Sequence, residues 1–336
     1  MKKILYIGNQ LSAHGLNKTS IETLGVLLAN EGYEMLFTSN KKNQWLRMFD
    51  MMKTTVLHAK KVDYILIDTY STSSFWYAFF CSQIAQLFGV NYIPILRGGD
   101  LPKKLKNNPK LCRKVFANAY RNVAPSGYLK NAVEQAGFTN IIHIPNSIEI
   151  QKYQFKSRTD FAPKLLWVRA FATLYNPEMA VKVLFELQKT YPNATLTMVG
   201  PDKDGSMITT KAFAEKLGVT VHFTGQLSKE DWWKLAIDYD FFINTTNFDN
   251  TPVSVMEAMA LGLPVVSTNV GGIPYLITHE ETAMLVNAAD VDQMTCAILG
   301  LISNKEKTIK MVQNARILIE KMDWNIVKQD WNLLLK

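Results

Sequence analysis

The chain has 336 residues, of which 48% are hydrophobic and 20% are charged, so it can bury a substantial core and is too long for one ordinary domain. Its three cysteines (Cys81, Cys112 and Cys296) are odd in number and widely spaced, which argues against a disulfide framework or a zinc site and favours a reducing cytoplasm. The net charge of +8 arises in the first half, because residues 1–150 hold 18 Lys and Arg against 9 Asp and Glu.

The N-terminus, "MKKILYIGN", predicts a first strand, because it lacks the long apolar core and the small-residue cleavage site of a signal peptide. The most apolar window, residues 75–96, is interrupted by Gln83, Gln86, Gly89, Asn91 and Pro94. This pattern indicates a buried helix followed by a strand rather than a membrane span. We therefore predict no membrane-spanning segment.

Short β-branched runs alternate with longer amphipathic stretches along the whole chain. The runs are KKILYIG, YEMLFTS, DYILID, NYIPIL and IIHIP in the first half, and KLLWVRA, ATLTMVG, VTVHFTG, DFFINTT, LPVVSTN and AMLVN in the second. Such alternation is typical of βαβ units, so we predict an α/β fold with two Rossmann-like parallel-sheet domains. The polar stretch 151–163 is the expected linker, which gives domains of residues 1–155 and 156–321.

The basic residues of the first half are densest in "LPKKLKNNPKLCRKVF", which starts at Leu101. The simplest interpretation of this run is a solvated helix face. The alternatives are a site for an anionic membrane surface or for a phosphorylated substrate. Nucleic acid is not expected as a partner, because no aromatic residues alternate with these Lys and Arg residues and no nucleic-acid-binding module is recognisable.

Two parallel sheets that face one another across a hinge are expected to bind ligand in the cleft between them, beside the carboxyl ends of the strands. The stretch "NTPVSVMEAMALG" predicts a helix that begins there. Asn250 or Thr251 is a suitable N-cap, Pro252 fits the first helical position, and Gly262 is placed to end the helix.

The first turn of this helix is a candidate phosphate site. The amides near Val253 and Ser254 have no intrahelical acceptor and lie at the positive end of the helix dipole. Glu257 follows five residues after Pro252, about 7 to 8 Å along the axis at about 1.5 Å per residue. A nucleoside diphosphate has about this span from phosphate to ribose, whose two hydroxyls a carboxylate accepts as a pair. The alternative for Glu257 is a solvated helix residue.

This stretch resembles the nucleotide-sugar site of the glycosyltransferase family 4 enzymes, which have the GT-B fold. Thr251 to Gly272 is similar to the family pattern G-x-P-x-x-x-x-E-A-x-A-x-G-x-P-V-V-x-x-x-x-G-G. Further similar segments follow in the family's order: "APSGYLKNAVEQAGF" with Ser126, "IIHIPNSIEI" with Asn146, "LLWVRAF", "TMVGPDKDG", "VHFTGQL" and "AMLVNAADVDQM".

The resemblance implies roles for individual residues. It implies that Arg169, in "LLWVRAF", contacts the donor diphosphate, and that Asp249 and Glu257 form the family's acidic pair. Asn250, Thr251, Pro252, Val253, Ser254, Gly200 and Gly15 are the other candidate donor-binding residues, and Gly15 is expected to begin the first helix. His14, Arg97 and Asp100 are candidates for the acceptor or sugar side. The C-terminal helix, residues 322–336, is expected to pack back onto the first, acceptor-side domain.

Three departures from the family pattern stand out. Asp249 replaces a Glu and is one methylene shorter, and Tyr175 stands where the family has a Lys that contacts the diphosphate. Arg97 stands where many members have a His, so the sugar subsite is expected to differ. A purely structural turn built on Gly98 and Gly99 is the alternative for Arg97 and Asp100.

The resemblance implies a retaining, metal-independent hexosyltransferase that moves a sugar from a nucleotide-diphosphate sugar to a polysaccharide- or lipid-linked acceptor. We expect no cofactor, and a cytoplasmic location with peripheral contact at the inner membrane face. The alternative is a catalytically weak, sugar-nucleotide-binding or scaffolding subunit. Asp202-Lys203-Asp204 and Asp238-Tyr239-Asp240 are not expected to bind a metal, because the second precedes a strand.

Overall fold

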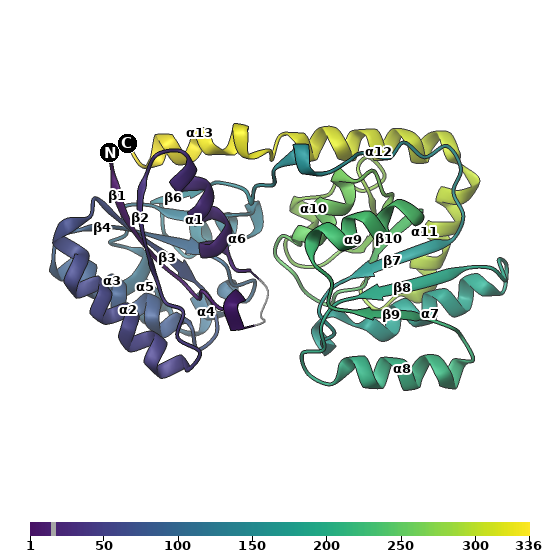
Figure 1. Cartoon of the computed structure of the whole chain (residues 1–336), viewed down its shortest axis with the longest axis horizontal. Coiled ribbons are helices and arrows are strands. Elements are labelled where there is room, and N and C mark those ends of the chain that lie inside the picture. The colour runs from purple at the N-terminus through teal and green to yellow at the C-terminus, as the bar shows by residue number, and fades with distance from the viewer. Residues whose placement is uncertain (15–17) are drawn as a thin grey trace. The chain divides into compact units, whose positions relative to one another are not determined.

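The computed structural model describes residues 1–14 and 18–336 of the chain. It divides into two compact units, one formed by residues 1–146 and 324–336 and the other by residues 147–323 (Figure 1). Each unit holds a six-stranded parallel sheet flanked by helices. The α/β fold class with two parallel sheets that the sequence predicts is therefore confirmed.

The sheet of the first unit has the strand order β2-β1-β3-β4-β5-β6. Its strands are β1 (Lys3–Ile7), β2 (Glu34–Thr38), β3 (Tyr64–Thr69), β4 (Asn91–Leu96), β5 (Asn122–Ala124) and β6 (Ile141–His143). The sequence reading missed β5, because three residues are too few to show an alternating pattern. Of the other five strands, four fall within the runs that the sequence indicates, and β3 extends one residue beyond its run, to Thr69.

Helices cover both faces of this sheet. They are α1 (Ser20–Asn30), α2 (Gln44–His58), α3 (Phe75–Leu87), α4 (Leu101–Asn107), α5 (Pro109–Phe116), α6 (Gly127–Gln135) and α13 (Trp324–Leu334). Alternate strand residues point to opposite faces, so Ile4 and Tyr6 pack with α1 and α13, whereas Leu5 and Ile7 pack with α2 and α3.

The C-terminal helix α13 is part of the first unit, although it is the last element of the chain. Trp324 and Trp331 are buried in the cluster that contains Ile4 and Tyr6. The indole of Trp324 also donates a hydrogen bond to Glu31 at the end of α1, at 3.2 Å.

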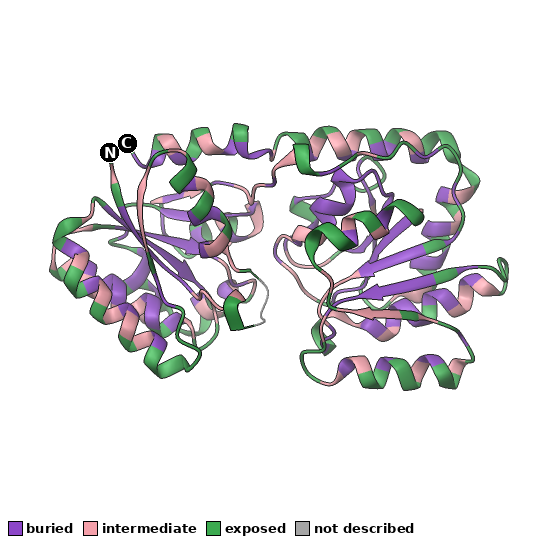
Figure 2. Ribbon diagram, viewed as in Figure 1, coloured by how far each residue is buried: buried purple, intermediate pink, exposed green. Residues whose placement is uncertain are grey.

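The sheet of the second unit has the order β12-β11-β10-β7-β8-β9. Its strands are β7 (Lys164–Val168), β8 (Thr195–Val199), β9 (His222–Gly225), β10 (Phe241–Asn244), β11 (Val265–Thr268) and β12 (Met284–Val286). All six lie within the predicted runs. Figure 2 shows that the central strands are almost entirely buried, which explains why they are continuous apolar runs rather than alternating ones.

Two helical layers sandwich this second sheet. One contains α7 (Pro177–Gln188), α8 (Ser206–Leu217) and α11 (Val291–Ser303), and the other contains α9 (Lys229–Leu235), α10 (Val253–Ala260) and α12 (Lys305–Glu320). None of the helices in the described part of the chain combines the length and the apolar composition that crossing a bilayer requires.

The expected linker, residues 151–163, is packed onto the second unit instead of bridging the two units. Arg158 is 6% exposed, and its guanidinium donates to the carbonyl oxygens of Gly262 at 2.8 Å, Ala236 at 3.0 Å and Tyr239 at 2.9 Å. Burial lowers the pKa of Arg158 to about 10. The polarity of this stretch predicted a linker, but Arg158 in it donates hydrogen bonds to carbonyl oxygens of the second unit.

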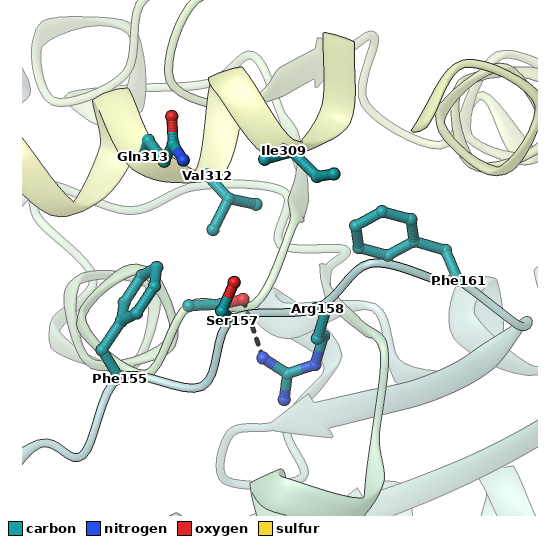
Figure 3. A pocket seen from close by; sticks show the side chains of 8 residues that line it. Phe155, Ser157, Arg158, Phe161, Ile309, Val312 and Gln313 are labelled. Atoms are coloured by element: carbon teal, nitrogen blue, oxygen red, sulfur yellow. Dashed lines mark hydrogen bonds between the residues drawn. The ribbon is translucent and has the colours of Figure 1, made fainter. Parts of the chain in front are cut away.

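Figure 3 shows Arg158 at a small pocket together with Phe155, Phe161, Ile309, Val312 and Gln313. The pocket has a volume of about 10 Å³, which leaves room for about one water molecule. Gly262 and Phe161 precede β11 and β7, so the pocket lies at the amino ends of the strands, opposite the end at which parallel sheets bind ligands.

Candidate functional site

The predicted site residues of the second unit meet where the strand order reverses. Arg169 directly follows β7, and Asp249 lies in the loop that follows β10. β7 and β10 are neighbours, and from them the sheet continues through β8 on one side and β11 on the other. Such a switch point leaves a crevice at the carboxyl ends of the strands, where open α/β sheets bind their ligands.

Arg169 and Asp249 form an ion pair between the Nη2 and Oδ2 atoms, with both side chains largely buried. The guanidinium also lies over the ring of Tyr175, with its central carbon 4.3 Å from the ring centroid. Tyr175, which stands where the sequence resemblance places a Lys, thus contacts the cation through the face of its ring instead of adding a second positive charge. The sequence reading had assigned Tyr175 only the loss of a charge.

The loop that carries Tyr175 is tied to the end of β10 by backbone and side-chain hydrogen bonds. The hydroxyl of Thr245 donates to the carbonyl oxygen of Tyr175 at 2.8 Å, and the amide of Asn247 donates to that of Leu174 at 2.8 Å. Thr245 in turn accepts a bond from the buried indole of Trp167 at 3.0 Å. The platform under Arg169 is therefore built from two neighbouring strands.

Three glycines allow the loops of the site to approach one another closely. A Cβ on Gly271, whose φ is +56°, would lie 2.1 Å from the carbonyl oxygen of Asp249, and one on Gly272 would lie 2.1 Å from that of Asn250. A Cβ on Gly200 would lie 1.8 Å from the carbonyl oxygen of Arg169. Gly200, predicted to bind the donor, thus has a clear local role in positioning Arg169.

Helix α10 begins one residue later than the sequence predicts. Pro252 has an extended ψ of 111° and takes the N-cap position, which the sequence reading had given to Asn250 or Thr251, and Val253 is the first helical residue. The amides of Val255 and Met256 bond to the carbonyl oxygen of Pro252. Gly262, with a φ of +78°, ends the helix as expected.

Several polar groups at this point lack partners. Within residues 1–14 and 18–336, the amides of Val253 and Ser254 have no hydrogen-bond acceptor. In the same part of the chain, the buried side-chain atoms Arg169 Nε, Thr251 Oγ1 and Ser254 Oγ have no partner either. Native structures pair nearly all buried polar groups, so a cluster of unpaired donors indicates a place where a ligand or water completes the bonding.

Glu257, on the same helix, is 3% exposed. Its Oε1 atom accepts from the hydroxyl of Tyr153 at 3.0 Å and from Nζ of Lys229 at 2.6 Å. Burial raises the pKa of Glu257, although Lys229 and Tyr153 act in the opposite direction. Among the described residues, nothing bonds to Oε2, which leaves one carboxylate oxygen for another donor.

Tyr153 and Lys229 are site residues that the sequence reading missed. Tyr153 lies in the stretch predicted to be a linker, and Lys229 opens the short helix α9 as one of several exposed lysines. No motif distinguishes either residue, because their contact with Glu257 depends on how three distant segments pack. The ring of Tyr153 also lies 4.4 Å from that of Trp233, which fixes its orientation.

The candidates of the first unit are not brought together in one cluster. His14 is exposed, and its Nε2 atom lies 2.9 Å from the carbonyl oxygen of Asn40. Asp100 is exposed at the N-cap position of α4 and makes no side-chain capping bond. Gly15 lies outside the described residues.

Arg97 is bonded within the first unit. Its Nε atom donates to Oδ1 of the buried Asp68 at 3.1 Å, and its Nη1 atom donates to Oδ1 of Asn146 at 2.9 Å. The hydroxyl of Tyr6 donates to the same oxygen of Asp68, and burial raises the pKa of Asp68. These contacts favour a structural role for Arg97.

The two Asp-x-Asp sequences serve local structure. Asp204 accepts from the amide of Thr173 at 2.9 Å, Asp202 accepts from that of Gly205 at 3.0 Å, and Asp240 accepts from that of Ala162 at 3.2 Å. In the part of the chain that the structure covers, no group of three or more His, Cys, Asp and Glu residues is arranged to hold a metal ion.

Comparison with known proteins identifies the family. The model of the family "Glycosyl transferases group 1" matches residues 149–318, which is half of the chain and includes every residue of the α10 site. The chain therefore belongs to this family of glycosyltransferases. The match shows membership of this group as a whole. The narrower assignment to family 4, which the sequence resemblance suggested, goes beyond what the match shows.

Curated relatives match over part of their length. The sulfoquinovosyl transferase SQD2 of Arabidopsis thaliana is 30% identical over 152 residues, which are 44% of this chain and 29% of that protein. A GDP-mannose-dependent alpha-(1-6)-phosphatidylinositol monomannoside mannosyltransferase of Mycobacterium tuberculosis is 22% identical over 231 residues, 66% of this chain and 57% of that protein. The matched region thus spans between about a third and just over half of these relatives.

Among solved structures, Anabaena Alr3699/HepE in complex with UDP superposes with a TM-score of 0.80 at 17% identity, over 100% of this chain and 99% of that one. At this level of identity the likeness shows the fold alone. It supports the assignment of the two parallel-sheet units to the GT-B fold.

The buried position of Glu257 predicts a pH-dependent effect of Glu257→Gln on stability. Because burial raises the pKa of this carboxyl, the unfolded chain ionises before the folded one, and the native protein loses stability as the pH rises through the folded-state value. The uncharged Gln side chain avoids that loss. We expect the thermal midpoint of Glu257→Gln, relative to that of the unmodified chain, to rise as the pH increases above about 4.3, the usual pKa of a Glu carboxyl in an unfolded chain.

Thermal unfolding across this pH range provides the measurement. Glu215→Gln is the matched control, because Glu215 is an exposed residue of helix α8. A constant difference between Glu257→Gln and the unmodified chain at all pH values would show that the carboxyl titrates normally in the folded protein.

Proposed function

We propose that the chain is a retaining glycosyltransferase that takes a sugar from a nucleotide-diphosphate donor. The observation that carries this proposal is the cluster of unpaired donors around the start of α10, formed by the amides of Val253 and Ser254 and by Arg169 Nε. An anion with several acceptor oxygens would satisfy these groups together, and a diphosphate is such an anion. The UDP and UDP-glucose complexes of HepE support the same class of ligand.

The donor would lie along α10 in this proposal. The diphosphate would bond to the first-turn amides and to the side chains of Thr251 and Ser254, and Glu257 Oε2 would accept from a ribose hydroxyl. Lys229 already holds Oε1 at 2.6 Å, so the carboxylate is oriented before a donor arrives. The Tyr153 hydroxyl, whose pKa is raised by burial and by the charge of Glu257, stays protonated and keeps donating to that carboxylate.

The chemical step places negative charge on the departing diphosphate oxygen and positive character on the anomeric carbon. Arg169 and the α10 amides would neutralise the departing charge, and we propose that this chemistry needs no metal ion. Asp249, which neutralises Arg169 in the ion pair, would exchange part of that contact for a hydroxyl of the transferred sugar. The exchange frees the Arg169 guanidinium for the diphosphate only when a donor is present.

The acceptor is proposed to be a polysaccharide- or lipid-linked sugar in surface glycan biosynthesis. The relative from M. tuberculosis is named for a phosphatidylinositol monomannoside acceptor, which supports a lipid-linked class. We propose a cytoplasmic location with peripheral contact at the inner membrane face. His14, Arg97 and Asp100 remain candidates for the acceptor or sugar side, with His14 and Asp100 exposed on the first unit.

A second candidate function is a sugar-nucleotide-binding or scaffolding subunit with weak catalysis. Two observations favour it: Tyr175 replaces the family's Lys, and Asp249 already pairs with Arg169. Incubation with UDP-, GDP-, ADP- and CMP-sugars, with thermal shift for binding and nucleotide release for turnover, separates the two functions. Binding without release in the presence of any tested glycan or lipid acceptor would favour the subunit.

Substitution of Glu257 by Ala is predicted to weaken donor binding. The loss of a charge-assisted hydrogen bond to the ribose corresponds to about 1.5 to 3 kcal/mol, or roughly a 10- to 150-fold rise in the dissociation constant. Calorimetry with the donor that gives the largest thermal shift is the measurement, and Glu215→Ala is the control. An unchanged dissociation constant would rule out the ribose role of Glu257.

The stereochemical outcome is predicted to be retention. Donor and product would carry the same anomeric configuration, which proton NMR of the purified product reads directly from the coupling of the anomeric proton. The reaction is also expected to proceed at an unchanged rate in the presence of a chelator. An inverted linkage would exclude the retaining mechanism, and loss of activity that manganese restores would exclude metal independence.

A further inference from the structure

One face of the first unit is formed by three helices that lie side by side. Helix α3 packs between α2 and α5, with α2 on one side and α5 on the other (Figure 1). The inner sides of α2 and α3 bury residues such as Met51 and Tyr77 against the sheet. Their outer sides, together with that of α5, form a surface that we call the α2–α3–α5 face.

Large apolar side chains are exposed along this face. In Figure 2 the helices α2 and α3 carry exposed (green) segments, whereas the strands of the sheet are largely buried (purple). On α2, Trp45 is 69% exposed and Phe49 is 60% exposed, and their spacing of four residues places them on one side of the helix. On α3, Trp76 is 48% exposed, and its ring stacks with that of Phe80, with 6.0 Å between the ring centroids. Leu46, Val56, Leu57 and Leu87 are the other exposed apolar residues of the two helices.

A hollow lies between the amino-terminal ends of α2 and α3. Its volume is about 260 Å³, and Trp45, Met48 and Trp76 line it together with Ser73, Ser74 and Tyr77. A cluster of this kind differs from single exposed hydrophobic residues, which are common on soluble proteins. A contiguous apolar surface next to a hollow marks a binding surface.

Cations surround these apolar residues. The exposed residues Lys41, Lys42, Lys53, Lys60 and Lys61 lie on or beside α2, and Lys110, Arg113 and Lys114 lie on α5. None of the eight forms an ion pair within the described part of the chain. The three helices contain a single acid, Asp50, which accepts from the hydroxyl of Thr38 at 3.3 Å.

We propose that the α2–α3–α5 face docks onto an anionic lipid bilayer. Tryptophan and phenylalanine partition into the interface between headgroups and acyl chains, and lysines around them are attracted to anionic headgroups. This inference rests on the membrane contact included in the proposed function and names the surface that makes it. The α5 part of the basic run predicted from the sequence, Lys110, Arg113 and Lys114, lies on this surface.

A second copy of the chain fits this face less well than a bilayer does. An isologous contact between two copies would bring the eight cations of one face against those of the other, and the three helices of each copy offer only Asp50 to compensate them. A bilayer offers both an apolar layer for the aromatic side chains and negative charge for the lysines. The positive charge of the α2–α3–α5 face therefore favours an anionic lipid surface over a second copy of the chain.

Flotation with lipid vesicles tests the proposal on the full chain. We expect the protein to float with vesicles of phosphatidylcholine and phosphatidylglycerol, to float weakly with phosphatidylcholine alone, and to be released by high salt. The fluorescence of Trp45 and Trp76 should shift to shorter wavelength on binding. Equal binding to neutral and anionic vesicles, or no binding to either, would overturn the proposal.

Paired variants locate the contact. Trp45→Ser with Phe49→Ser should weaken vesicle binding by about ten-fold or more, because two aromatic anchors are lost. Lys53→Glu and Lys114→Glu should each weaken it by about five-fold or more. The matched controls are Ile208→Ser, which changes a residue that is 71% exposed on α8, and Lys216→Glu on the same helix, and both should bind as the unmodified chain does.

Two further measurements keep the outcomes distinct. The thermal shift with nucleotide sugars should be unchanged in the Trp45→Ser and Phe49→Ser double variant, so failure of membrane docking can be told from failure of the proposed donor site. Light scattering in solution reports on self-association. A dimer that dissociates in the double variant, with vesicle binding unaffected, would assign the face to a second copy and overturn the membrane proposal.

Discussion

The candidate site depends on the close approach of backbone segments at the carboxyl end of the second sheet. Gly271 and Gly272 pack directly against the carbonyl oxygens of Asp249 and Asn250, and Gly200 packs against that of Arg169. Any side chain at these positions would force the loops apart. Because the loops after β7, β8, β10 and β11 are held at backbone contact, the charged side chains they carry meet at one point.

This arrangement keeps the positive charge of Arg169 balanced when no donor is bound. Asp249 neutralises it, and Tyr175 supports the guanidinium by a cation–π contact at 4.3 Å. A buried arginine without such partners would be costly, since burial lowers its pKa. The buried carboxylate of Glu257 is stabilised in the same way, because Lys229 and Tyr153 donate hydrogen bonds to it. Both ends of the site are thus organised in advance, and in the proposed function a diphosphate would have to compete with Asp249 for the Arg169 guanidinium.

Much of the fold is predictable from the sequence, because parallel strands that are buried on both faces leave continuous apolar runs. Ten of the twelve strands lie within the predicted runs, β3 extends one residue beyond its run, and β5 was missed because it has only three residues. The start of α10 was predicted to within one residue from Pro252 and Gly262. These signals are local: they depend on turn chemistry and periodicity within a few neighbouring residues.

The contacts that complete the site were not predictable in the same way. Tyr153 and Glu257 are 104 positions apart, and the polarity around Tyr153 predicted a linker between the domains. Arg158, in the same stretch, is buried because three carbonyl oxygens need a donor, which no sequence pattern reveals. The exposed aromatic residues of α2 and α3 are a further case, since only the structure separates outward-facing residues from those in the core.

The most direct test is a crystal structure of the chain with a bound nucleotide-diphosphate sugar. The account predicts phosphate oxygens at hydrogen-bond distance from the amides of Val253 and Ser254 and from Arg169, with the ribose against Glu257. A donor bound elsewhere, with Arg169 Nη2 still paired to Asp249 Oδ2 and the first turn of α10 unoccupied, would contradict it.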